Sequence, residues 1–180
     1  AYRTAHMSRT SLTAAQDAPG VGAGYGLAVR GWLGRVGSVG DIERGEPFDP
    51  TEGDTTAGGE PSGVAGTVPG IALPKGVPAT YYSLEFTGFI QIPRDGIYTF
   101  HLASDDGSVL EIAGEVVVDH DGIHTEWSKA GQIALAAGWH EIRIRHFQRQ
   151  WGAALKLELE GPGVPRQEVP ETWLTHRPAA

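Results

Sequence analysis

Hydrophobic and polar residues alternate along much of the second half of the chain. Tyr98, Phe100 and Leu102 fall on one face of such a segment, because successive side chains of a strand point to opposite faces of a sheet. The same period of two recurs in residues 141–145 and 155–160, where isoleucine or leucine alternates with charged residues. These segments are typical of antiparallel strands with one buried and one solvated face.

Turn-forming residues separate the alternating segments, as in Pro93-Arg-Asp-Gly96, Asp105-Asp106-Gly107 and Ala113-Gly114. No segment shows a convincing helical period of 3.6 residues. Strands this closely spaced predict an all-β fold, built as an antiparallel two-sheet sandwich or a barrel. The predicted strands cover residues 27–33, 80–92, 97–103, 108–112, 115–118, 132–135, 139–147 and 154–160.

Glycine and proline are concentrated in residues 19–79. The 26 glycines and 12 prolines of the 180-residue chain exceed the ordinary share of roughly 12% for the two together, which argues against a helix bundle. Acidic residues dominate 41–60, as is typical of a solvated loop. We therefore expect residues 1–22 to be an N-terminal extension or a segment left by cloning. Residues 23–176 form one β-sandwich domain, with a long acidic, Gly/Pro-rich loop at 41–78.

Charge and composition exclude several classes of protein. The absence of cysteine excludes disulfide frameworks, thiolate metal sites and cysteine nucleophiles. The formal net charge is −8, and no run of lysine or arginine offers a surface for nucleic acid, so we expect no nucleic-acid partner. No stretch approaches the roughly 18 consecutive apolar residues of a membrane span, so we expect no membrane insertion.

Several motifs, in this order along the chain, resemble the PA14 domain family. They are Gly26-Leu27 to Leu33, Phe86-Thr-Gly-Phe-Ile-Gln-Ile-Pro-Arg-Asp-Gly-Ile-Tyr-Thr-Phe100, Ser104-Asp105-Asp106-Gly107-Ser108, Val116 to Asp119, Trp139-His-Glu-Ile-Arg-Ile-Arg-His-Phe-Gln148, and Gly152-Ala-Ala-Leu-Lys-Leu-Glu-Leu159. Together they cover most of residues 26–175. The resemblance implies a PA14-type antiparallel β-sandwich with long irregular N-terminal segments.

The resemblance also implies a function. PA14 domains are usually modules of larger secreted or cell-surface proteins, joined to glycosidases, adhesins, flocculins or toxins. Their lectin members bind glycans through a calcium ion held by two adjacent aspartates that are joined by a cis peptide bond. Asp105 and Asp106 stand at those positions in this chain.

The residue types suit that chemistry. Calcium takes six to eight hard oxygen ligands, and vicinal sugar hydroxyls supply two of them where the protein leaves the ion partly open. A cis bond would bring the carboxylates of Asp105 and Asp106 to one side of their loop, and Gly107 would let the backbone turn away afterwards. The alternative interpretation of Asp105-Asp106-Gly107 is a turn shaped by aspartates, without a ligand.

A second loop, Phe147-Gln-Arg-Gln-Trp-Gly152, is expected to complete the site. In the fungal lectins of the family this loop supplies an asparagine and backbone carbonyls to the calcium, but this chain contains no asparagine. The predicted metal ligands are therefore Asp105, Asp106, Gln148, Arg149 and Trp151, the loop residues acting through a side-chain oxygen or a carbonyl. The predicted sugar-binding residues are Asp105, Asp106, Arg149, Gln150, Trp151 and Asp121. Trp151 either offers its indole face to a pyranose or packs as a core or edge tryptophan.

Other candidate motifs carry less weight. The loop from Asp119 to His124 is expected to face the aspartate pair, but its spacing matches no recurring transition-metal motif. His140, Glu141 and His146 resemble a zinc-protease motif, yet they lie on a predicted strand and not on a helix. No paired catalytic motif, nucleophile elbow or P-loop is present, so we expect no enzyme.

Two functions remain open. The first is a calcium-dependent carbohydrate-binding module of a larger extracellular, periplasmic or cell-surface protein, with a glycan or polysaccharide and other domains of the parent polypeptide as partners. The second is a structural or protein-interaction module that binds neither sugar nor calcium, in which the aspartates only shape a turn.

Overall fold

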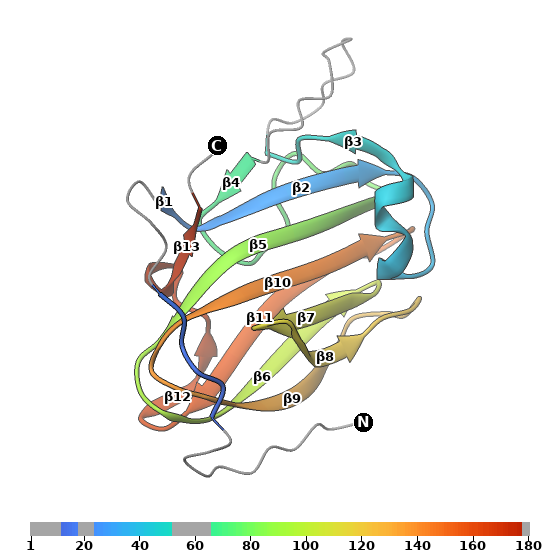
Figure 1. Cartoon of the computed structure of the whole chain (residues 1–180). Coiled ribbons are helices and arrows are strands. Elements are labelled where there is room, and N and C mark those ends of the chain that lie inside the picture. Colours follow the sequence, from blue (N-terminus) through green and yellow to red (C-terminus); the bar gives the residue numbers. More distant parts are fainter. Residues whose placement is uncertain (1–11, 18–23, 52–65, 178–180) are drawn as a thin grey trace.

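Two antiparallel β-sheets pack against each other in the computed structural model, which describes residues 12–17, 24–51 and 66–177 (Figure 1). The all-β sandwich expected from the alternating pattern is confirmed. The described residues include no helix long and apolar enough to span a membrane.

The larger sheet forms the front layer of Figure 1. Its central strands are β5 (Tyr82–Ile92) and β10 (Gly138–Gln148), which pair along eleven residues of each strand. On one side of this pair lie β7 (Ser108–Ile112) and β8 (Glu115–His120); on the other lie β2 (Leu27–Leu33), β3 (Glu46–Phe48), β4 (Gly66–Val68), β13 (Leu174–His176) and β1 (Gly24–Tyr25).

The smaller sheet lies behind the larger one. Its strand order is β12 (Val164–Glu168), β11 (Ala154–Gly161), β6 (Gly96–Asp105) and β9 (Trp127–Leu135). Two short 3₁₀ helices, η1 (Val39–Arg44) and η2 (Glu171–Trp173), complete the elements that the described residues form.

The eight predicted strands correspond to β2 and to β5 through β11. The short strands β1, β3, β4, β12 and β13 were not predicted. Four of them span only two or three residues, and β12 (VPRQE) contains a proline and shows no alternation of apolar and polar residues. Two of them, β3 and β4, come from the stretch 41–78 that the sequence predicts as loop, and both pair with β2.

The N-terminal extension also touches the domain. In the described segment 12–17, the N–H of Thr13 donates to the carbonyl of Ala134 (2.8 Å), and the N–H of Gln16 donates to that of Trp139 (3.0 Å). These bonds attach the segment to the ends of β9 and β10.

The inner faces of the two sheets form one hydrophobic core. Phe86 and Ile144 of the larger sheet and Phe100 and Leu102 of the smaller one are fully buried within it. A smaller cluster lies on the outer face of the larger sheet, where Val39 and Ile42 of η1 pack on apolar side chains of that face. Those side chains are Trp32, Val109 and Phe147.

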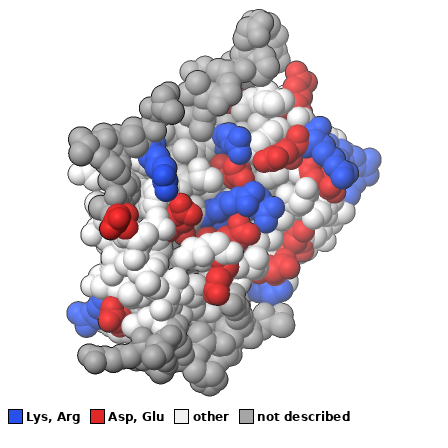
Figure 2. All heavy atoms as spheres, viewed as in Figure 1, with Lys and Arg blue, Asp and Glu red and all other residues white. Residues whose placement is uncertain are grey.

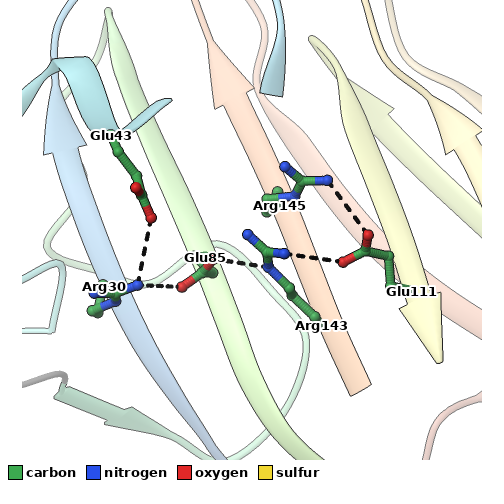
Figure 3. Close-up of polar contacts among 6 residues, drawn as sticks. All are labelled: Arg30, Glu43, Glu85, Glu111, Arg143 and Arg145. Atoms are coloured by element: carbon green, nitrogen blue, oxygen red, sulfur yellow. Dashed lines mark hydrogen bonds and ion pairs between the residues drawn. The ribbon is translucent and has the colours of Figure 1, made fainter. Parts of the chain in front are cut away.

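Acidic and basic side chains lie next to one another on the outer face of the larger sheet, among uncharged residues (Figure 2). Glu85 on β5 is 4% exposed, and it accepts hydrogen bonds from Arg30 on β2 (2.6 Å) and Arg143 on β10 (2.9 Å). Glu111 on β7 pairs with Arg143 (3.3 Å) and Arg145 (3.7 Å), so the ion pairs run across four strands (Figure 3). We call these five residues the charge ladder. Each of its carboxylates faces two guanidinium groups.

Candidate functional site

A depression of about 470 Å³ opens at the end of the sandwich where β6 and β10 terminate. Three loops surround it: the β6–β7 loop, the β8–β9 loop and the β10–β11 loop. It is lined by Asp105, Asp106, Ile123, His124, Thr125, Arg149, Gln150 and Trp151. The fold therefore brings together five of the residues that the sequence predicts for the site.

Asp105 is the open carboxylate of the site. It is joined to Asp106 by a cis peptide bond, as the family resemblance implies. No hydrogen bond or ion pair connects its side chain to the described part of the chain. Partial burial, together with the negative charge of Asp106, raises the pKa of the Asp105 carboxyl above its ordinary value. A cation beside Asp105 would oppose both effects, because it favours the charged form of the carboxyl.

Asp106 is buried and joins two of the loops. Its Oδ1 accepts the backbone N–H of His124 (3.2 Å), and its Oδ2 accepts the backbone N–H of Arg149 (2.9 Å). No described lysine or arginine forms an ion pair with it. Because each carboxylate oxygen accepts only one of these bonds, lone pairs remain on both. Asp106 therefore holds the walls of the depression and retains capacity for a ligand.

Gly107 is required by close packing beneath this loop. A Cβ at this position would lie 2.4 Å from Cε1 of Phe147 and 2.8 Å from the backbone N and O of Gly122. The carbonyl of Gly107 accepts the N–H of Phe147 (3.0 Å) and a hydrogen bond from Nδ1 of the buried His146 (3.0 Å). Burial lowers the pKa of His146 to about 4, so its imidazole is neutral at pH 7.

The β10–β11 loop carries the exposed aromatic side chain of the site. Trp151 is 91% exposed, so its indole lies at the surface and not in the core. Its φ of 70° is in the left-handed region, which costs a non-glycine residue roughly 1–2 kcal/mol. The carbonyl of Arg149 accepts the N–H of Tyr81 (2.9 Å). The loop thus presents a flat apolar face beside two carboxylates.

Gln148 and Asp121 do not line the depression. Gln148 is fully buried at the end of β10, and its amide nitrogen faces the loop carbonyls. Asp121 contacts η1: its Oδ1 accepts the N–H of Val39 (2.9 Å), and its Oδ2 accepts the hydroxyl of Ser38 (2.6 Å). Gln148 therefore contacts the β10–β11 loop, and Asp121 joins the β8–β9 loop to the start of η1; neither side chain reaches the depression.

Of the three remaining lining residues, Ile123 and Thr125 were not singled out from the sequence, whereas His124 ends the loop that was expected to face the aspartate pair. The β8–β9 loop was expected to face the aspartates, and it does so through these residues. Ile123 is 59% exposed, and the ring of His124 stacks on that of His120 at 4.1 Å between centroids. An irregular loop has no repeating pattern of residues, so the sequence does not show which of its side chains face a neighbouring loop.

Calcium suits the two carboxylates, since they are hard oxygen donors without a cationic partner in the described residues. No group of three or more His, Asp or Glu side chains suited to a metal occurs in residues 12–17, 24–51 and 66–177. The remaining ligands would therefore be backbone carbonyls, water or hydroxyls of a bound sugar. Asp105 and Asp106 would hold the ion.

Similar proteins support both the fold and the family. Residues 72–173, more than half of the chain, match the family model of the PA14 domain. Anti-sigma-I factor RsgI3 of Acetivibrio thermocellus is 27% identical over 94 residues, which are 52% of this chain and 15% of that protein. The chain thus spans a small part of this curated relative.

Solved structures share the same architecture. An anti-sigma factor domain-containing protein from Clostridium clariflavum aligns with a TM-score of 0.65 and 23% identity, over 98% of this chain and 52% of that one. The A domain of epithelial adhesin 9 from Candida glabrata, in complex with Galβ1-3GlcNAc, aligns with a TM-score of 0.65 and 11% identity, over 93% of this chain and 96% of that one. The match to the family model, together with the sandwich and the paired aspartates at its end, shows that this chain belongs to the PA14 domain family.

Proposed function

We propose that this chain is a carbohydrate-binding module that holds calcium on Asp105 and Asp106. One observation carries the proposal: two adjacent carboxylates without a cationic partner in the described residues line a depression beside a tryptophan that is 91% exposed. Carboxylates that lack a counter-ion favour a bound cation, and an exposed indole favours the C–H face of a sugar ring. The A domain of epithelial adhesin 9, which shares the fold, was solved in complex with Galβ1-3GlcNAc.

The residues of the depression have separate roles in this proposal. Asp105 and Asp106 hold the ion, which when bound supplies open coordination positions for vicinal hydroxyls. Trp151 stacks on the sugar ring, and the side chains of Arg149 and Gln150 donate hydrogen bonds to further hydroxyls. We propose binding and not catalysis, because the family is one of binding modules and no second carboxylate lines the depression apart from the adjacent pair.

The wider setting is part of the proposal. We expect an extracellular, periplasmic or cell-surface location, because glycans and millimolar calcium occur there. The chain covers 52% of the solved anti-sigma relative and 15% of the curated one, which favours a module attached to other domains of a longer polypeptide. These relatives also support a second candidate function, an interaction module of a regulatory protein that binds a protein partner.

A glycan array followed by isothermal titration calorimetry tests the proposal. Binding is measured in calcium and in chelator, for the wild type and for Asp105→Asn and Trp151→Ala. We expect chelation and Asp105→Asn to abolish binding. Trp151→Ala should weaken binding about tenfold or more, because the lost stacking contact contributes roughly 1.4 kcal/mol to the binding free energy. Tyr25→Ala, which removes another exposed aromatic side chain far from the depression, is the matched control and should bind normally.

The outcomes separate the candidate functions. Glycan binding that survives both the chelator and Asp105→Asn would contradict the role of calcium while leaving the sugar site intact. Failure of every glycan, with no rise of the melting temperature on calcium addition, would favour the protein-interaction module. A ligand at about 100 times its Kd should stabilise the folded state by about 2.7 kcal/mol, so the rise would be easily measured.

A further inference from the structure

The β10–β11 loop folds around the side chain of one residue. Nε2 of Gln148 donates to the carbonyl oxygens of Gly152 (2.8 Å), Gln150 (3.3 Å) and Trp151 (3.3 Å). Three consecutive carbonyls thus converge on a single amide nitrogen. Converging carbonyl oxygens repel one another unless a donor or a cation lies between them, and here the amide N–H groups of Gln148 take that place.

The orientation of the amide follows from the same geometry. Carbonyl oxygens only accept hydrogen bonds, so the nitrogen and not the oxygen of Gln148 must face them. The other terminal atom, Oε1, is buried and has no hydrogen-bond partner in the described residues. Gln148 itself is 0% exposed and does not line the depression. In this orientation, its side chain offers no oxygen to the depression.

The rest of the loop is anchored by the protein as well. The N–H of Arg149 donates to Asp106, and the carbonyl of Arg149 accepts from Tyr81. With the carbonyls of Gln150 to Gly152 turned inward onto Gln148, the indole of Trp151 is left at the surface, where it is 91% exposed. Both backbone polar groups of Arg149 and the carbonyls of residues 150–152 are thus held by contacts within the chain.

We propose that Gln148 is a positioning residue that forms the β10–β11 loop in the absence of any metal or ligand. The loop that presents Trp151 is then preformed, and calcium at Asp105 and Asp106 does not create it. This inference deepens the proposed function, since it concerns the same loop, but it assigns Gln148 to loop order and not to metal coordination. Its test needs neither glycan nor calcium.

Amide hydrogen exchange of the peptide that covers residues 148–153 measures the order of the loop directly. In the wild type we expect the same exchange rates in calcium and in chelator, within about twofold. Protection that appears only in calcium would overturn the proposal, because the metal would then order the loop.

Two substitutions of Gln148 separate positioning from metal binding. Gln148→Glu replaces the donor by an acceptor, so we expect exchange in the loop to become about tenfold faster or more, while the central strands remain unchanged. A calcium ligand would behave in the opposite way, because an added carboxylate would tighten calcium binding. Gln91→Glu adds the same charge to an exposed position of β5 that does not line the depression, and it is the matched control.

Gln148→Met keeps the assignment testable if the glutamate variant fails to fold. It retains the length and burial of the side chain and removes its three hydrogen bonds. We expect faster exchange in the loop, with the calcium-induced rise of the melting temperature retained. Unchanged exchange in Gln148→Met, or loss of the calcium response to the same extent as in Asp105→Asn, would overturn the proposal.

Discussion

Two pairs of carboxylates in this molecule differ in what surrounds them. Glu85 and Glu111, on the outer face of the larger sheet, each face two guanidinium groups (Figure 3). Asp105 and Asp106, at the end of the sandwich, face no described lysine or arginine within ion-pair distance. Their surroundings are backbone N–H groups and an open depression.

The difference distinguishes a structural carboxylate from one that is available to a ligand. A buried charge is costly unless it is paired, and the charge ladder pairs both of its glutamates within the chain. At the depression the chain provides hydrogen bonds for Asp106 but leaves Asp105 open, and the pKa of Asp105 is raised in consequence. Four substitutions test this comparison, from the largest expected effect to the smallest.

The largest effect is expected for Asp106→Ala. It leaves the N–H groups of His124 and Arg149 without an acceptor, which costs about 1–3 kcal/mol for each group, so we expect a loss of about 2–6 kcal/mol. Urea unfolding measures the change. Asp119→Ala removes an exposed carboxylate that accepts one solvent-exposed hydrogen bond (3.1 Å), and it should cost less than about 1 kcal/mol. Equal effects of the two substitutions would show that Asp106 does not hold the loops.

Glu85→Gln should have the next largest effect. It removes the charge that Arg30 and Arg143 face, but both arginines are about half exposed and can turn to water. We therefore expect a loss of about 1–2 kcal/mol, below the roughly 3–5 kcal/mol of a fully buried pair. Glu158→Gln is the matched control, because Glu158 pairs with Arg166 (3.3 Å) at the surface of the smaller sheet. A wild-type melting temperature for Glu85→Gln would mean that the ladder is not needed for stability.

Asp121→Ala tests whether this residue supports the site from outside. The substitution removes the acceptor for Val39 and Ser38 at the start of η1, and we expect a loss of about 1 kcal/mol, as for a helix cap. Glycan affinity should then change less than it does for Trp151→Ala, as titration calorimetry would show. Complete loss of glycan binding in a folded Asp121→Ala variant would place this residue among the direct sugar contacts.

Asp105→Asn should have the smallest effect on stability, and its sign is opposite. A raised pKa means that the folded state holds the Asp105 proton more tightly than the unfolded state does. In the absence of calcium, the stability contributed by this residue therefore falls as pH rises from 3.8 through the raised value. We expect the substitution to stabilise the calcium-free protein at pH 7 by about 0.5 kcal/mol or less, since the carboxyl is only partly buried and water screens its charge.

The pH dependence of unfolding checks that prediction. Above pH 3.8 the stability of the wild type should fall as pH rises, and that of the variant should fall less. Calcium should stabilise only the wild type. An asparagine variant that is less stable than the wild type without calcium would mean that the charge of Asp105 is compensated within the chain.

Much of the fold followed from local patterns in the sequence. Strands β2 and β5 through β11 were predicted because alternation and turn signals are properties of neighbouring residues. The family was identified from motifs such as Ser104-Asp105-Asp106-Gly107-Ser108. The short strands β3 and β4 were missed because they exist through pairing with β2, which no local pattern encodes. Local patterns thus predict the long strands but not the short strands that pair with them.

The chain by itself determined an all-β sandwich, an acidic pair in a turn and a tryptophan in a neighbouring loop. Only the tertiary structure decided what those residues contact. It placed Asp121 on η1, brought Ile123 to Thr125 to the depression, and turned the amide nitrogen of Gln148 onto three carbonyls. The physical reason is that side-chain orientation in irregular loops is set by donors and acceptors distant in sequence, whereas strand formation depends on residues two positions apart.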